Sequence, residues 1–90
     1  MKSIFKSKVS LDILHYLYVK NTANMHDISK NLKIAYAHVH NTIKILKNKN
    51  LIEIKKYGRQ TIIKPTKDGK RIGKLVKEIK EIAGEVDEIF

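Results

Sequence analysis

The sequence predicts a small, mainly α-helical domain that carries one β-hairpin and ends in a long helix. Two observations support this fold class. Apolar residues recur every three or four positions up to about residue 49 and again after residue 66, whereas residues 51–64 alternate between apolar and polar side chains. The first spacing is typical of one buried helix face and the second of a half-buried strand. With 90 residues, 42% of them hydrophobic, the chain can form one modest core.

The first helix is predicted to begin at Ser7 or Ser10, either of which can cap its first turn, and to end near Lys20. The polar residues before Asn24 break the helical pattern. A short second helix is then expected, because Asn24 and Asp27 have the spacing of a capping residue and an acid in the first turn. The buried face of the first helix is predicted to comprise Val9, Ile13, Leu14 and Leu17.

A third helix is predicted over residues 36–49, after a tight turn at residues 33–35. Val39, Ile43 and Leu46 lie four and then three positions apart, which places them on one buried face. The opposite face is then exposed, and it carries Tyr36, Ala37, His40, Asn41, Lys44 and Lys47, with His38 at its edge.

The hairpin is predicted from two short strands over residues 51–57 and 61–64, joined by a turn at residues 58–60. Pro65 is expected to end the second strand, because proline cannot donate a backbone hydrogen bond. This hairpin is strongly polar and basic, and its candidate ligand-binding residues are Lys55, Lys56, Arg59, Gln60 and Lys64. Lysines on edge strands also prevent aggregation, which is an alternative explanation for Lys55 and Lys56.

The last helix is predicted to start after Thr66, a good N-cap with Asp68 in the first turn, and to run almost to the end of the chain. Its apolar stripe is wider than one small domain needs, so we expect it to pair two copies of the chain. The alternative is that it packs entirely on its own domain. The predicted dimer interface comprises Ile72, Leu75, Val76, Ile79, Ile82, Ala83, Val86, Ile89 and Phe90.

The charge of the chain is uneven and predicts a polyanionic partner. The formal net charge is +10, and residues 1–65, with thirteen basic and three acidic residues, account for all of it. Such a surface is typical of nucleic-acid binding, although enrichment in lysine, isoleucine and asparagine can also reflect an AT-rich genome.

Other classes of function find little support in the sequence. No apolar run is long enough to span a membrane, and the lysine-interrupted start does not resemble a signal peptide, so a cytoplasmic, nucleoid-associated protein is expected. The chain has no cysteine, and His38 and His40 are two positions apart, which points them to different sides of a helix. We therefore expect no metal site, no cofactor and no enzymatic activity.

Residues 32–52 resemble the MarR/ArsR-type winged helix-turn-helix transcriptional regulators. In that family a Leu-Gly-Ile-Ser turn opens the recognition helix, which ends at a Gly-Leu-Ile/Val running into the wing. Residues 65–70 also resemble the Leu-Thr-Glu-Lys-Gly-Lys start of the family's last helix. The apolar positions that fall in register are Leu32, Ile34, Val39, Ile43, Leu46, Leu51 and Ile52.

Three positions depart from the family pattern. Lys33 stands at the usual turn glycine, and Asn50 replaces the glycine before the wing, where asparagine tolerates a left-handed backbone. Ala35 replaces the Ser/Thr N-cap of the recognition helix, which removes a cap worth about 1 kcal/mol.

The resemblance implies a winged helix-turn-helix domain over residues 7–65 and a dimerisation helix over residues 66–90. The recognition helix, residues 36–49, would enter the major groove of double-stranded DNA, and the wing, residues 51–64, would contact the backbone or the minor groove. Asn41 is suited to pair with adenine and Ala37 to contact a thymine methyl. Lys44 and Lys47 are suited to phosphates.

A dimeric, sequence-specific transcriptional regulator is therefore the first hypothesis. An architectural DNA-binding protein is the second, since small basic archaeal chromatin proteins with winged helices and coiled-coil dimers are similar in size and layout. A protein-interaction module is the third. Residues 67–80 hold six bases and two acids, whereas residues 81–90 hold four acids and no base. This polarity favours an antiparallel arrangement of the two C-terminal helices.

Overall fold

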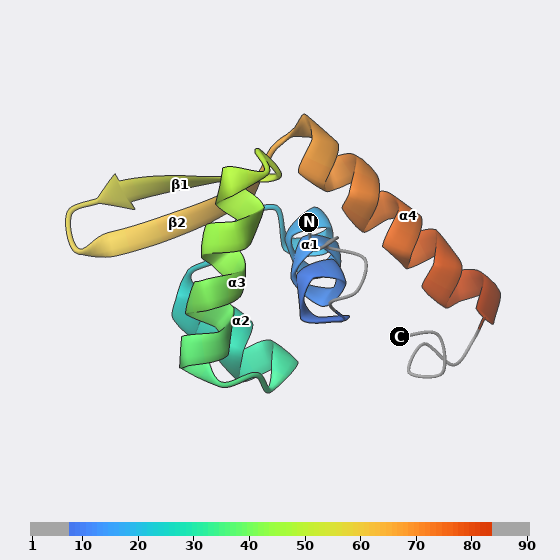
Figure 1. The fold of residues 1–90 in the computed structure, drawn as a ribbon, viewed down its shortest axis with the longest axis horizontal. Helices are drawn as coiled ribbons and strands as arrows, with labels where there is room; N and C mark the ends of the chain where they lie inside the picture. The colour runs from blue at the N-terminus through green and yellow to red at the C-terminus, as the bar shows by residue number, and fades with distance from the viewer. Residues whose placement is uncertain (1–7, 84–90) are drawn as a thin grey trace.

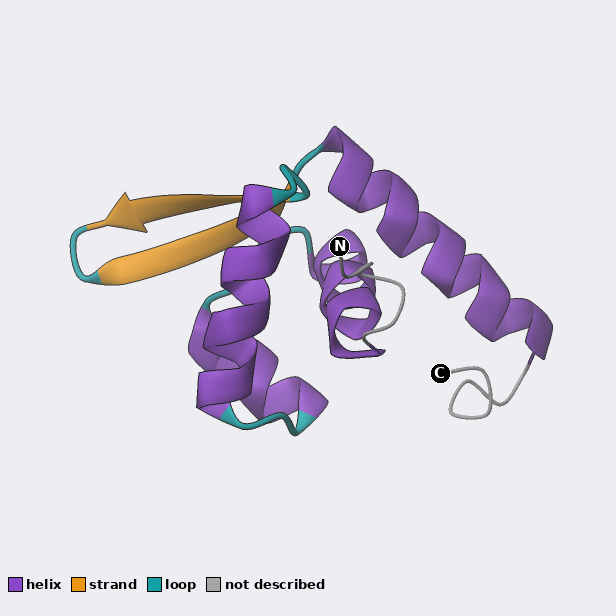
Figure 2. Ribbon diagram, in the orientation of Figure 1, coloured by secondary structure: helices purple, strands orange, loops and turns teal. Residues whose placement is uncertain are grey.

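The computed structural model describes residues 8–83, and its elements follow the predicted order of three helices, a hairpin and a helix (Figure 1). The helix α1 lies between α3 and α4, and the hairpin and α4 extend on opposite sides of the molecule (Figure 2). The elements are α1 (Lys8–Lys20), α2 (Met25–Leu32), α3 (Tyr36–Asn48), β1 (Ile52–Tyr57), β2 (Gln60–Pro65) and α4 (Lys67–Ala83).

The core forms where α1, α2, α3 and the base of the hairpin meet. Its fully buried side chains include the predicted face of the third helix and, apart from Val9, which is only partly buried, that of the first. Each fully buried aliphatic side chain contributes about 1.5–3 kcal/mol on burial. The buried face predicted for the third helix is thus confirmed, and its opposite face is exposed except at His40, which is half-buried. The fully buried residues are Ile13, Leu14, Leu17, Ile28, Val39, Ile43, Leu46 and Ile63.

The turn between α2 and α3 is closed by side-chain and backbone hydrogen bonds. The Ser29 hydroxyl donates to the Ile34 carbonyl at 2.6 Å, and the Ile34 N–H donates back to the Ser29 carbonyl at 3.0 Å. Lys33 occupies the left-handed position of this turn, with φ 56°. At Ala35 no side chain caps α3, as predicted. The Ser29–Ile34 pair thus holds a turn that lacks both the usual glycine and the usual cap.

The N-cap predicted for the second helix is confirmed, since the Asn24 Oδ1 accepts a hydrogen bond from the Asp27 N–H at 2.7 Å. The residue before it behaves differently from the prediction. Ala23 pairs with Ile63 of β2 through two backbone hydrogen bonds, of 3.1 and 2.7 Å. The stretch predicted only to break the helical pattern therefore also forms a single antiparallel bridge to β2 at Ala23.

The hairpin is antiparallel, with Ile52 opposite Pro65 and Tyr57 opposite Gln60. Its turn is shorter than predicted, because Gln60 belongs to β2 and only two residues remain in the loop. Pro65 is the last residue of β2, as predicted. The tip of the hairpin is exposed, whereas its base, at Ile52 and Ile63, is buried in the core.

The start of α4 is tied to the end of α3 through Thr66. Its hydroxyl oxygen accepts a hydrogen bond from the Gly69 N–H at 3.2 Å and donates to the Asn50 carbonyl at 2.7 Å. Asn50 has the left-handed conformation expected of it, with φ 59°. The predicted N-cap of the last helix is therefore confirmed, and it also joins two elements.

The helix α4 packs closely on α1, at Gly73 above all. A Cβ atom at Gly73 would lie 2.5 Å from the Leu14 carbonyl oxygen and 2.6 Å from the Tyr18 Cβ, distances that real side chains do not tolerate. Val76, one turn further on, is buried on the same face. This contact determines which apolar residues of α4 are covered by α1 and which remain exposed.

The stripe predicted for the dimer interface is divided between two roles. Ile72 packs against the core, and Val76 is buried, so both side chains serve the chain's own domain rather than a second copy. Leu75, Ile79 and Ile82 are exposed, to 57%, 40% and 87%, and Ala83 is exposed beside them. Val86, Ile89 and Phe90 lie outside the described residues.

Candidate nucleic-acid interface

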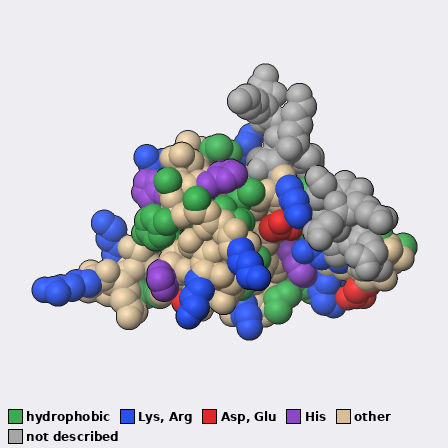
Figure 3. Space-filling model, turned by 90° about the horizontal axis from the view of Figure 1, so that it is seen from below, with side chains coloured by type: hydrophobic (Ala, Val, Ile, Leu, Met, Phe, Trp, Pro, Cys, Tyr) green, Lys and Arg blue, Asp and Glu red, His purple; other side chains and the backbone are tan. Residues whose placement is uncertain are grey.

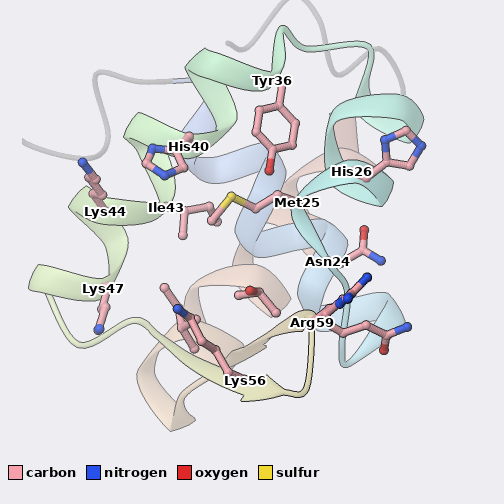
Figure 4. A pocket seen from close by; sticks show the side chains of 13 residues that line it. Asn24, Met25, His26, Tyr36, His40, Ile43, Lys44, Lys47, Lys56 and Arg59 are labelled. Atoms are coloured by element: carbon pink, nitrogen blue, oxygen red, sulfur yellow. The ribbon is translucent and has the colours of Figure 1, made fainter.

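A groove of about 630 Å³ lies between the start of α2, the exposed side of α3 and the hairpin (Figure 4). Three elements that are distant in sequence therefore form one concave surface. Its lining consists of Asn24, Met25, His26, Tyr36, His40, Ile43, Lys44, Lys47, Ile54, Lys56, Arg59, Gln60 and Thr61. Seven of these thirteen residues were predicted from the sequence as candidate ligand contacts.

The groove combines an apolar floor with a basic rim. Met25 and Ile43 lie in the middle of the view in Figure 4, with the Tyr36 ring above them. Two bases come from α3 and two from the hairpin, namely Lys44, Lys47, Lys56 and Arg59. The lining contains no carboxylate, so nothing within it neutralises these four charges. Such a concave, one-signed surface concentrates its field on an anion.

The four basic side chains are also free of ion pairs with the part of the chain that the structure describes. The ion pairs among residues 8–83 all involve α4, and none includes Lys44, Lys47, Lys56 or Arg59. An anionic ligand would supply the counter-charge that the described residues do not. The groove is therefore a candidate anion-binding surface.

The other predicted contacts lie near the groove but not in it. Ala37, His38 and Asn41 are exposed on α3 but do not line the groove. Lys55 is exposed and Lys64 is half-buried on the hairpin, and neither lines the groove. The alternation of a strand places Lys55 and Lys56 on opposite faces, which explains why only Lys56 reaches the groove.

Sequence reasoning missed the contribution of α2. Asn24, Met25 and His26 line the groove from the start of α2, where Figure 4 shows His26 and Asn24 across from the Lys44 and Lys47 side of α3. The sequence predicted a role only for Asn24, as the cap of the second helix. The start of α2 comes to lie beside α3 and the hairpin only in the folded chain.

Charge is distributed differently on the side formed by α1 and α4. Figure 3 shows Lys and Arg side chains at the far end of the hairpin, with the Asp and Glu side chains mostly toward the α4 end. There Lys80 Nζ lies 3.6 Å from Asp12 Oδ1 and 3.1 Å from His15 Nδ1. Burial, and then the charge of Lys80, lower the pKa of His15. The basic residues of this side are thus partly neutralised within the fold.

Two further properties concern only residues 8–83. No three His, Cys, Asp or Glu side chains in this range are grouped so that they could hold a metal ion. The described helices are also too short or too polar to cross a membrane.

Comparisons with known proteins agree with this geometry. The sequence matches the family described as winged helix DNA-binding domain over residues 9–82. The fold is similar to AF1382 from Archaeoglobus fulgidus, with a TM-score of 0.79 and 23% identity over 93% of this chain and 99% of that one. It is similar to MepR, a transcription regulator of the Staphylococcus aureus multidrug efflux pump MepA, with a TM-score of 0.72 and 25% identity over 91% of this chain and 58% of that one.

A mutant of ZitR from Lactococcus lactis is also similar, with a TM-score of 0.75 and 22% identity over 83% of this chain and 53% of that one. The chain thus spans little more than half the length of ZitR and of MepR. A comparison with curated proteins finds no match.

Proposed function

This chain belongs to the winged helix DNA-binding domain family, and from that premise we propose that it regulates transcription by binding duplex DNA with α3 in the major groove and the hairpin as its wing. The family is one of DNA-binding proteins rather than enzymes. The observation that carries the proposal is the groove between α3 and the hairpin, whose four bases have no acid within the lining.

The groove suits the sugar-phosphate backbone of one DNA strand. With α3 in the major groove and the wing at the neighbouring minor groove, the strand between them passes over the groove. Lys44 and Lys47 then approach its phosphates from one side, and Lys56 and Arg59 from the other. These contacts orient the protein and do not depend on sequence.

Base recognition is assigned to the part of α3 that faces away from the wing. Ala37 and Asn41 are exposed one turn apart near the start of the helix, the part of a recognition helix that reads base edges. Asn41 is suited to a two-hydrogen-bond contact with adenine, and Ala37 to a thymine methyl. Tyr36 and His40, which line the groove, are assigned to the backbone beside these bases.

The proposal is tested by titrating the protein with a pool of random duplexes, followed by selection of the tightest binders. A regulator is expected to bind its selected site at least about 10³-fold more tightly than random DNA. Equal affinity for all duplexes would favour the architectural protein, and no binding at low salt would favour a protein-interaction module. Lys74→Ala, on the exposed side of α4, is the control that should leave DNA binding unchanged.

The proposal includes a homodimer formed through α4. Leu75, Ile79 and Ile82 are exposed on α4, whereas Ile72 and Val76 pack against the chain's own domain. The net charge of +4 on residues 67–80 and of −4 on residues 81–90 supports an antiparallel pairing, in which each acidic end lies beside the basic half of its partner.

Sedimentation and crosslinking test this dimer. A sedimentation profile of a monomer at working concentrations would contradict it. In an antiparallel pair, Ile79→Cys near the crossing point should crosslink to its own copy, whereas Glu88→Cys near the end should not. Efficient crosslinking at Glu88→Cys would instead indicate a parallel pair.

A further inference from the structure

Two histidines line the groove from different elements. His26 lies in the first turn of α2, and His40 lies in the middle of α3, and Figure 4 shows them on either side of Tyr36 at the edge of the groove. Neither has a hydrogen bond or ion pair with another described side chain. Both imidazoles are therefore available to a ligand that enters the groove.

The charged groups that share the groove with these histidines are all cationic. Lys44 and Lys47 face it from α3, and Lys56 and Arg59 face it from the hairpin, together with the uncharged phenol of Tyr36. Asp27 follows His26 along α2, and Glu53 lies on β1, but neither residue lines the groove. Within the described lining, the only opposite charge that could meet a protonated imidazole is the ligand's own.

Histidine is the side chain that gains or loses its charge between about pH 5 and pH 8. A phosphate within a few ångströms favours the imidazolium form, since an opposite charge at that distance stabilises the charged state. An imidazolium in turn binds the phosphate more strongly than a neutral imidazole does. Binding of an anion and binding of a proton are then reciprocally coupled.

We infer that DNA binding in this groove is coupled to proton uptake by His26 and His40, so that the affinity for DNA rises as the pH falls. This inference rests on the proposed function, because it assigns the groove to the DNA backbone. It adds a response to pH that the lysines and Arg59 cannot supply, since they stay charged throughout this range. The coupled ligand is the phosphate, so the response is expected on random as well as on selected DNA.

The test measures fluorescence anisotropy of a labelled duplex with the full chain from about pH 8 to about pH 5.5, at constant ionic strength. The slope of the logarithm of affinity against pH gives the number of protons taken up. We expect the affinity of the unmodified protein to rise about tenfold or more across this range. The His26→Gln/His40→Gln double variant should reduce the change to about twofold or less.

His15→Gln is the matched control, because His15 lies on α1 against Lys80 and does not line the groove. This variant should keep the slope of the unmodified protein. Circular dichroism at each pH verifies that every variant stays folded, and calorimetry in two buffers of different ionisation enthalpy counts the protons directly.

The outcomes separate the two proposals. Binding that does not change with pH, or a slope that survives in the double variant or disappears in His15→Gln, would overturn the proton coupling while leaving DNA binding intact. An absence of binding at every pH and at low salt would overturn the proposed function and the coupling with it.

Discussion

The groove and the contact between α1 and α4 use the same amino acid in opposite ways. Lys80 on α4 lies against His15 and Asp12 of α1, and Lys77 donates a hydrogen bond of 2.6 Å to Glu81. The hydrogen bond to Glu81 raises the pKa of Lys77. The lysines of the groove have no such partners among residues 8–83. The comparison teaches that total charge is a weaker guide to function than the location of unneutralised charge.

The strongest test of this comparison is the dependence of DNA affinity on salt. If the unpaired bases of the groove face phosphates, binding releases condensed counterions, and affinity falls steeply with ionic strength. With roughly 6–10 phosphate contacts per dimer, raising the salt from about 50 to about 200 mM should weaken binding by about 10³–10⁵-fold. Anisotropy titrations at four salt concentrations measure the slope, and a nearly flat response would contradict DNA binding through this face.

A smaller effect should distinguish the two halves of the DNA-binding surface. Asn41→Ala is expected to weaken a selected site by about 1–3 kcal/mol and to spare random DNA, because it removes a base contact. Lys56→Ala should instead weaken all duplexes about equally, because a phosphate contact carries no sequence information. Competition titrations with selected and random DNA compare the two variants. An unchanged site preference in Asn41→Ala would show that α3 is oriented differently.

On the other side of the molecule, the contact of α4 with α1 should depend on Gly73. In an exposed helix position, changing glycine to alanine stabilises by up to about 1 kcal/mol. Here the new Cβ would meet the Leu14 carbonyl oxygen and the Tyr18 Cβ, so we expect Gly73→Ala to lose about 1–3 kcal/mol of unfolding free energy instead. Urea denaturation measures the difference. Lys74→Ala, exposed on the same helix, is the control, and equal behaviour of the two variants would refute the close packing.

The smallest expected effect is the pH dependence of stability that His15 contributes. Its pKa is lowered in the folded chain, so the unfolded chain binds more protons near the ordinary pKa of histidine, about 6.5. The contribution to stability is therefore present above that pH and is lost as the pH falls through it. His15→Gln should make the unfolding free energy less dependent on pH between about 7.5 and 5.5. Denaturation curves at several pH values check this, and an unchanged pH dependence would contradict it.

Local patterns in the sequence were sufficient for the elements and for most of the groove. Val39, Ile43 and Leu46 recur at helical spacing, and that spacing determines which face of α3 is buried and which is exposed. The Asn24 and Thr66 caps are local as well, since each side chain bonds a backbone group three residues ahead. Seven groove residues could thus be predicted because they lie on the exposed sides of two elements whose type was already clear.

The remaining features were decided by the tertiary structure alone, because they depend on contacts between residues that are distant in the chain. The bridge between Ala23 and Ile63 spans forty residues, and nothing in the polar stretch before Asn24 signals this pairing. The same long-range pairing brings the start of α2, with His26, to the groove. Likewise, the apolar stripe of α4 indicated only that a wide face needs covering. Which residues α1 covers was decided by the approach at Gly73, because periodicity defines a face but not the partner that buries it.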